Sequence, residues 1–78
     1  MNKKTTLNTL KPGEKARINS VNNTGSIKRR LLDIGLVKET EIKSILSSSG
    51  NQTLAYLIRG AVIAIRQEDA KNIYIQKV

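Results

Sequence analysis

The chain of 78 residues contains no cysteine and no histidine. Thiolate and imidazole groups are the usual ligands of zinc and of softer transition metals, so a site of that kind cannot be assembled from these residues. A hard-cation site needs several converging carboxylates, whereas the six acidic residues are scattered or belong to short surface segments. We therefore predict no metal site and no cofactor. The lack of cysteine also gives no sign of an oxidising compartment.

The same two absences bear on catalysis. Histidine is the commonest general base, and cysteine is the most reactive side-chain nucleophile. A mechanism that uses carboxylates alone needs two acids facing one cleft, and the spacing of the acids gives no indication of such a pair. The sequence therefore predicts a protein that is not an enzyme.

Aromatic residues are scarce as well: there is no Phe or Trp, and only Tyr56 and Tyr74 are present. The net charge of +8 is compatible with binding to nucleic acid, to an anionic membrane surface or to an acidic protein. Small barrels that bind single strands stack bases on aromatic side chains, and the basic residues here are spread from Lys3 to Lys77 without forming one stripe. Binding to another protein is therefore the main prediction, and a basic nucleic-acid-binding barrel is the alternative.

No apolar run approaches the ~20 residues that a membrane-spanning helix requires. The first six residues contain two lysines with no apolar stretch behind them, which is not the pattern of a signal peptide. We expect a single cytoplasmic domain over residues 1–78.

Alternation of apolar and polar residues predicts about five short strands, at 15–21, 40–46, 52–58, 61–66 and 72–77. Ile27, Leu31 and Ile34 recur at helical spacing and predict one helix over 25–34, with Thr24 or Ser26 as its N-cap. Residues 67–71 are compatible with one further helical turn. Together these elements favour a mostly β fold, a small and partly closed antiparallel barrel with one short inserted helix.

Three glycines are assigned to turns that need a backbone conformation which other residues adopt less readily. Gly13 follows Pro12 in a tight turn, and Gly60 follows Arg59 in another. Gly35 suits the position just after the helix, where a Schellman motif packs Leu36 back against Leu31. Residues 47–51, three serines followed by Gly and Asn, are expected to form a mobile hairpin tip.

The predicted helix carries three successive basic residues, Lys28, Arg29 and Arg30. Successive helical residues point about 100° apart, so these side chains do not converge on one phosphate. They form either a solvated face or a surface for an acidic partner, with nucleic acid as a weaker third case. Leu32 lies outside the apolar stripe and either covers the edge of the core or belongs to an exposed patch.

Several motifs occur in an order that covers nearly the whole chain: Leu7-Asn8-Thr9-Leu10-Lys11-Pro12-Gly13-Glu14, the run from Ser26 to Leu36, Ile58-Arg59-Gly60, and Ile63-Ala64-Ile65-Arg66 before Asp69-Ala70. This ordered set resembles the ferrous iron transport protein A (FeoA) family. Its most specific element is the run from Arg30 to Leu36 followed by Ile58-Arg59-Gly60. Two loops depart from the family pattern, because Lys38-Glu39 replaces the usual Pro-Gly, and Gly-Asn-Gln-Thr at 50–53 replaces a Gly-Asp-Pro-like segment.

The resemblance implies an SH3-like barrel and an accessory or regulatory role in Fe(II) uptake. It also implies a partner, the membrane transporter called ferrous iron transport protein B, which carries a cytosolic GTP-binding domain. A third interpretation, an allosteric ligand module similar to the related domain of some metal-dependent repressors, stays open. We expect the contact surface to be the helix and its exit, formed by Lys28, Arg29, Arg30, Leu32 and Leu36.

Overall fold

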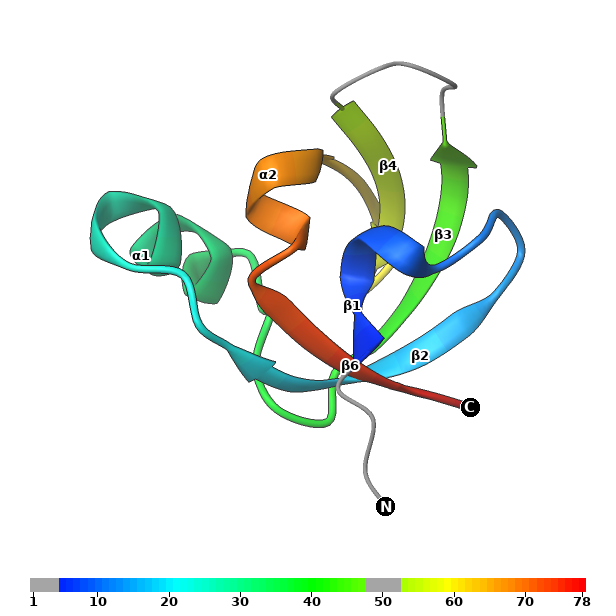
Figure 1. Cartoon of the computed structure of the whole chain (residues 1–78), viewed down its shortest axis with the longest axis horizontal. Helices are drawn as coiled ribbons and strands as arrows, with labels where there is room; N and C mark the ends of the chain where they lie inside the picture. The colour runs from blue at the N-terminus through cyan, green and yellow to red at the C-terminus, as the bar shows by residue number, and fades with distance from the viewer. Residues whose placement is uncertain (1–4, 48–52) are drawn as a thin grey trace.

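The computed structural model describes residues 5–47 and 53–78. In chain order the elements are β1 (Thr5–Thr6), the 3₁₀ helix η1 (Leu7–Thr9), β2 (Lys15–Val21), α1 (Gly25–Asp33), β3 (Glu41–Ser47), β4 (Thr53–Ile58), β5 (Ala61–Arg66), α2 (Gln67–Ala70) and β6 (Ile73–Lys77), as Figure 1 shows. The predicted mostly β fold with one inserted helix is confirmed. The expected hairpin tip at 47–51 lies, apart from Ser47, outside the described residues.

The described strands form one antiparallel sheet in the order β1-β6-β2-β3-β4-β5. Five of them were predicted, and the sixth is the two-residue β1, in which Thr5 lies opposite Ile75. Strand β2 pairs with a strand on each side: Ala16 lies opposite Ile42 of β3, and Ile18 lies opposite Ile75 of β6. A shift of register after Ile18 marks a bulge, which bends a strand and increases its twist.

One side of the curved sheet encloses the core. Alternate residues of β4 are buried, with Leu54, Tyr56 and Ile58 pointing inward. The Tyr56 hydroxyl donates a hydrogen bond to the carbonyl oxygen of Leu7 at 3.2 Å. Burial raises the pKa of Tyr56 well above its usual value of 10.0, because the phenolate would lose its hydration. The buried polar group thus joins β4 to η1 across the core.

Helix α1 is inserted between β2 and β3 and projects from one side of the barrel, on the side where α2 also lies (Figure 1). Leu31 is its one buried residue, while Ile27 and Ile34 are partly buried against the core. Within the described residues, neither helix has the length and apolar character needed to cross a membrane.

Candidate functional site

The start of α1 is held by few interactions. Thr24 occupies the N-cap position with an extended backbone, but its side chain makes no capping hydrogen bond. Gly25 has a φ of 66°, a conformation that glycine adopts without steric cost. The first turn also contains no acidic residue, so no carboxylate offsets the partial positive charge at this end of the helix. The first turn of α1 therefore depends little on local side-chain interactions.

The end of α1 is fixed by the predicted Schellman motif. The N–H of Gly35 donates to the carbonyl of Leu32, and the N–H of Leu36 donates to the carbonyl of Leu31, each at 3.0 Å. Gly35 has a φ of 98°, as this position requires. Leu31 and Leu36 both belong to the core. The assigned backbone conformations of Gly13 and Gly60, with φ of 91° and 83°, are also confirmed.

Four of the five residues predicted to contact a partner lie on the surface of α1. Lys28, Arg29 and Arg30 are exposed, and Leu32 exposes 41% of its surface. The prediction for Leu36 is wrong, because this residue is fully buried. The Schellman motif turns it inward against Leu31, so it cannot reach a partner while the fold is intact. Whether the other four bind a partner stays a prediction.

A groove of about 540 Å³ separates α1 from β5, and we call it the helix–edge groove. The helix contributes Ile27, Arg30, Leu31 and Ile34, which occupy i, i+3, i+4 and i+7 and so share one face. The opposite wall is formed by residues 63–66 of β5, and Glu68 and Asp69 of α2 close one part of it. Arg30 thus differs from Lys28 and Arg29, because it lines this groove.

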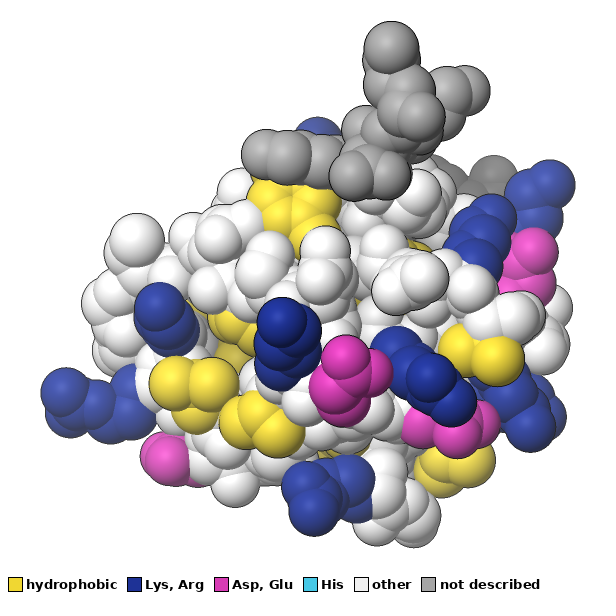
Figure 2. Space-filling model, turned by 90° about the horizontal axis from the view of Figure 1, so that it is seen from below, with side chains coloured by type: hydrophobic (Ala, Val, Ile, Leu, Met, Phe, Trp, Pro, Cys, Tyr) yellow, Lys and Arg dark blue, Asp and Glu magenta, His cyan; other side chains and the backbone are white. Residues whose placement is uncertain are grey.

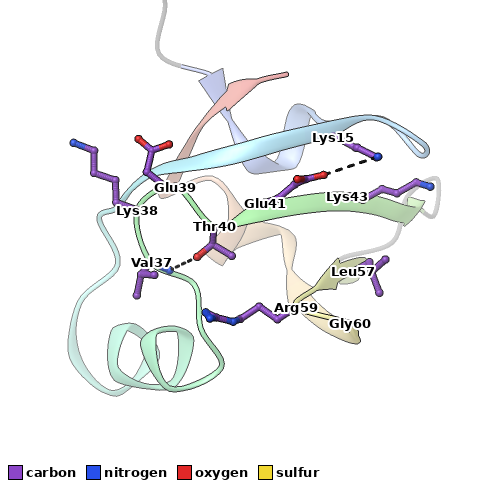
Figure 3. A pocket seen from close by; sticks show the side chains of 10 residues that line it. All are labelled: Lys15, Val37, Lys38, Glu39, Thr40, Glu41, Lys43, Leu57, Arg59 and Gly60. Carbon is purple, nitrogen blue, oxygen red and sulfur yellow. Dashed lines mark hydrogen bonds and ion pairs between the residues drawn. The ribbon is translucent and has the colours of Figure 1, made fainter.

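A second and shallower hollow of about 730 Å³ lies beside the helix exit, between β3 and the β4–β5 turn (Figure 3). Its border includes Lys15, Lys43 and Arg59 together with Glu41. The Lys15 ammonium lies 3.9 Å from a carboxylate oxygen of Glu41, and both side chains are more than half exposed. Such an ion pair contributes little to stability.

Arg59 connects the helix exit to the β4–β5 turn. Its side chain reaches toward the end of α1 (Figure 3), and a Cβ added to Gly35 would lie 2.5 Å from Arg59 Cδ. Gly35 is therefore required both for its backbone conformation and for this close approach. From the sequence, Arg59 was assigned only to a turn. The signal that pointed further was the pairing of Ile58-Arg59-Gly60 with the run from Arg30 to Leu36.

Basic side chains dominate the visible surface. Figure 2 shows Lys and Arg side chains spread over one face, with few acidic groups among them and small apolar areas between. The described residues form two ion pairs, Lys15 with Glu41 and Lys77 with Glu14. None of the three basic residues of α1 takes part in them, so their charges are available to a partner.

The carboxylate of Glu14 interacts with two nearby lysine residues. Glu14 accepts a hydrogen bond from the Lys11 backbone N–H at 2.8 Å and lies 3.7 Å from Lys77. The first of these contacts contributes most to lowering the pKa of Glu14 below its usual value. In the part of the chain that the structure describes, no three Asp or Glu side chains gather into a group that could hold a metal ion.

The fold and this site define a small SH3-like domain of the mostly β class, with a basic helix inserted beside an open groove. The FeoA domain family model matches residues 5–77. The chain is 36% identical over 73 residues to a protein of Campylobacter jejuni provisionally named Fe(2+) transport protein A, covering 94% of this chain and 99% of that one. The chain belongs to the FeoA domain family.

Solved structures of related proteins agree with the fold. The solution structure of the FeoA protein of Chlorobium tepidum matches with a TM-score of 0.88 at 26% identity, over 95% of this chain and 70% of that one. The zinc-complexed crystal structure of Stenotrophomonas maltophilia FeoA, described as a procaryotic SH3 domain protein, matches with a TM-score of 0.82 at 26% identity. That match covers 92% of this chain and 89% of the other.

Proposed function

We propose that this protein is a cytoplasmic accessory of Fe(II) uptake that acts by binding the cytosolic portion of the ferrous iron transporter. The observation that carries the proposal is membership of the FeoA family, together with a relative named for Fe(2+) transport that aligns over 94% of the chain. The protein contributes a binding surface and performs no chemistry, in keeping with the lack of histidine and cysteine in its sequence.

The exposed part of α1 supports this mode of action. Lys28, Arg29 and Arg30 form no ion pair among the described residues, and they lie on α1 together with the half-exposed Leu32. Steering by opposite charge speeds association with an acidic partner. Arginine is also among the residues that most often supply binding energy in interfaces. We therefore assign the transporter contact to Lys28, Arg29, Arg30 and Leu32.

The alternative, a basic barrel that binds nucleic acid, is favoured by the net charge of +8. It is disfavoured by the position of Tyr56, which is fully buried and so cannot stack on a base. A salt series separates the two. Binding to RNA that persists at physiological salt, with a steep dependence of log K on log salt, supports the alternative.

A binding experiment tests the assigned surface. Arg30→Glu and Leu32→Glu, introduced together, are expected to weaken binding to the purified cytosolic portion of the transporter by at least tenfold. Lys11→Glu is the charge-reversal control, matched to Arg30→Glu alone, because Lys11 is exposed and lies at the opposite end of β2 from the helix. Amide spectra verify that each variant is folded. Unchanged binding by the double variant shows that the surface is wrong.

A cellular experiment tests the role itself. Uptake of labelled Fe(II) under anaerobic conditions is measured in cells that lack the gene and in cells that carry it back as wild type or Arg30→Glu. We expect uptake to fall on deletion and to be restored by wild type but not by Arg30→Glu. Unchanged uptake in the deletion strain contradicts the accessory role.

A further inference from the structure

The backbone of β5 has one unpaired side. β5 is the last strand in the sheet order, so β4 is its one neighbour among the described strands. Arg59 and Gly60 both have positive φ, 52° and 83°, as a two-residue type I′ hairpin requires. The residues that flank such a turn, Ile58 and Ala61, form a hydrogen-bonded pair, and such pairs then alternate along the ladder. The backbone groups of Val62 and Ala64 therefore point away from β4.

This edge lacks the usual protection against pairing. Natural edge strands carry proline, charged residues or bulges that discourage an additional strand. β5 reads Ala-Val-Ile-Ala-Ile before its first charge at Arg66, and its register with β4 is regular along all six residues. Val62 exposes 64% of its surface. An apolar, regular and exposed edge of this kind is a template for another strand.

The helix–edge groove runs along this edge. Residues 63–66 all line it, although neighbouring side chains of a strand point to opposite faces of the sheet. Four consecutive residues can border one groove when the groove follows the edge itself. The facing wall is the apolar face of α1, with Ile27 and Ile34 partly buried. An added strand would thus meet backbone groups on one side and apolar side chains on the other.

The charges of the molecule indicate which kind of segment can bind in the helix–edge groove. A second copy of this chain would bring together two molecules of net charge +8, which repel each other. Arg30 and Arg66 both line the groove and form no ion pair among the described residues. Glu68 and Asp69 also line the groove, close after Arg66 in the chain. The preference for an acidic segment therefore rests on the net charge of +8 and on Arg30.

We propose that the β5 edge and the helix–edge groove bind an extended segment of a partner protein as an additional strand of the sheet. The segment is net acidic, and alternate side chains are apolar so that they lie against Ile27, Ile34 and Ile63. Hydrogen bonds to Val62 and Ala64 supply affinity without demanding a particular sequence, and the groove supplies selectivity. This inference does not depend on the proposed function, since it holds whichever protein provides the segment.

Amide hydrogen exchange measured by NMR on the wild-type protein tests the proposal. The probe is an acetylated and amidated heptapeptide in which valine and threonine alternate and both terminal residues are aspartate. Exchange at the Val62 and Ala64 amides is expected to slow by a factor of 1 + [L]/Kd, or ~10-fold when the peptide is at about nine times its Kd. Ile63 and Ile65 already pair with β4, so their exchange should change much less.

A pair of variants isolates the backbone contact. Ala64→Pro removes one outward N–H at an edge position, where proline is tolerated, and should abolish the protection at Val62. Ala64→Ser keeps the N–H and should bind as the wild type does. If Ala64→Pro fails to fold, the alternation of protection along β5 in the wild type still decides the question.

Three results overturn the proposal. The first is unchanged exchange at Val62 and Ala64 with the peptide at ~1 mM, a weak limit for binding. The second is protection of the same amides without peptide that rises with protein concentration, which identifies a second copy as the occupant. The third is equal binding of a control peptide with lysine in place of aspartate, which removes the charge assignment. Slower exchange at the two amides, lost with Ala64→Pro and weakened with the lysine peptide, supports it.

Discussion

The interior of the barrel and helix α1 are built from similar aliphatic residues but are fixed to different degrees. Ile18, Ile42 and Ile58 are at most 1% exposed and lie on strands paired on both sides. In α1, Leu31 is buried, whereas Ile27 lies half-buried on a wall of the helix–edge groove. The difference indicates that the sheet carries the stability of the domain. The helix is then free to carry charges and an open groove that folding alone does not require.

The first prediction compares one isoleucine from each region. Ile58→Ala should lower the free energy of unfolding by ~2–5 kcal/mol, because it leaves a cavity in a closed core. Ile27→Ala should lower it by about 1 kcal/mol, because this side chain is only partly removed from water. Urea denaturation of the two variants measures both values. Equal losses would show that α1 is as firmly packed as the barrel.

The second prediction concerns the junction between the two regions. Gly35→Ala should destabilise the protein by ~1–3 kcal/mol, because alanine is strained at a φ of 98° and its Cβ would meet Arg59. Gly13→Ala is the matched control, since Gly13 has a similar φ of 91° but no atom within 4 Å of the added Cβ. Thermal denaturation compares them. The excess loss at Gly35 should disappear when Arg59 is also changed to Ala, and an excess that remains excludes this contact as its cause.

The third prediction tests the barrel interior alone. Tyr56→Phe should lower the free energy of unfolding by about 1 kcal/mol, because it removes the hydrogen bond to Leu7. The pKa of Tyr56 is raised in the fold, so its contribution is complete below pH ~10 and is lost as the pH rises toward the folded-state pKa. Unfolding curves between pH 8 and 12 should show less alkaline loss for Tyr56→Phe than for wild type. The same alkaline loss in Tyr56→Phe as in the wild type would contradict the assignment.

The fourth prediction is a small gain in stability from a substitution in the connection between α1 and β3. Glu39 has a φ of 76°, in a turn closed by the Thr40 N–H and the Val37 carbonyl at 3.0 Å. Since the left-handed conformation is strained for residues other than glycine, Glu39→Gly should stabilise the protein by about 1 kcal/mol. Glu39→Ala keeps the strain and removes the charge, so it should give no gain. A gain shared by both variants would mean that charge is responsible.

The sequence predicted elements whose signals are local. β2 and β5 begin and end where the alternation placed them, and the residues around Gly35 determined how α1 ends. β1 was missed because two residues show no alternation, and Thr5 and Thr6 pair with β6, which is distant in sequence. The turn at Glu39 could not be predicted from its residues, since the Glu39 N–H bonds to the carbonyl of Ile18, far away in sequence.

The candidate site was predicted in part for the same reason. Lys28 and Arg29 are exposed because they lie off the apolar stripe of α1, whereas Arg30 is exposed at the border of the groove face. Leu36 was given two roles that exclude each other, since a residue that packs back on Leu31 cannot also face a partner. The helix–edge groove depends on how α1 stands relative to β5, and no pattern within either segment contains that information.

The double pairing of β2 has a consequence for the order of events on the ribosome. β6 supplies one neighbour of β2 and the neighbour of β1, with Ile75 opposite both Ile18 and Thr5. The sheet therefore cannot be completed in a nascent chain until β6 has emerged, although all the other strands are already available. Until then the inward face of β2 is partly uncovered, so an arrested or truncated chain should require a chaperone. Such distant pairings also make folding slower than in helical bundles of the same size.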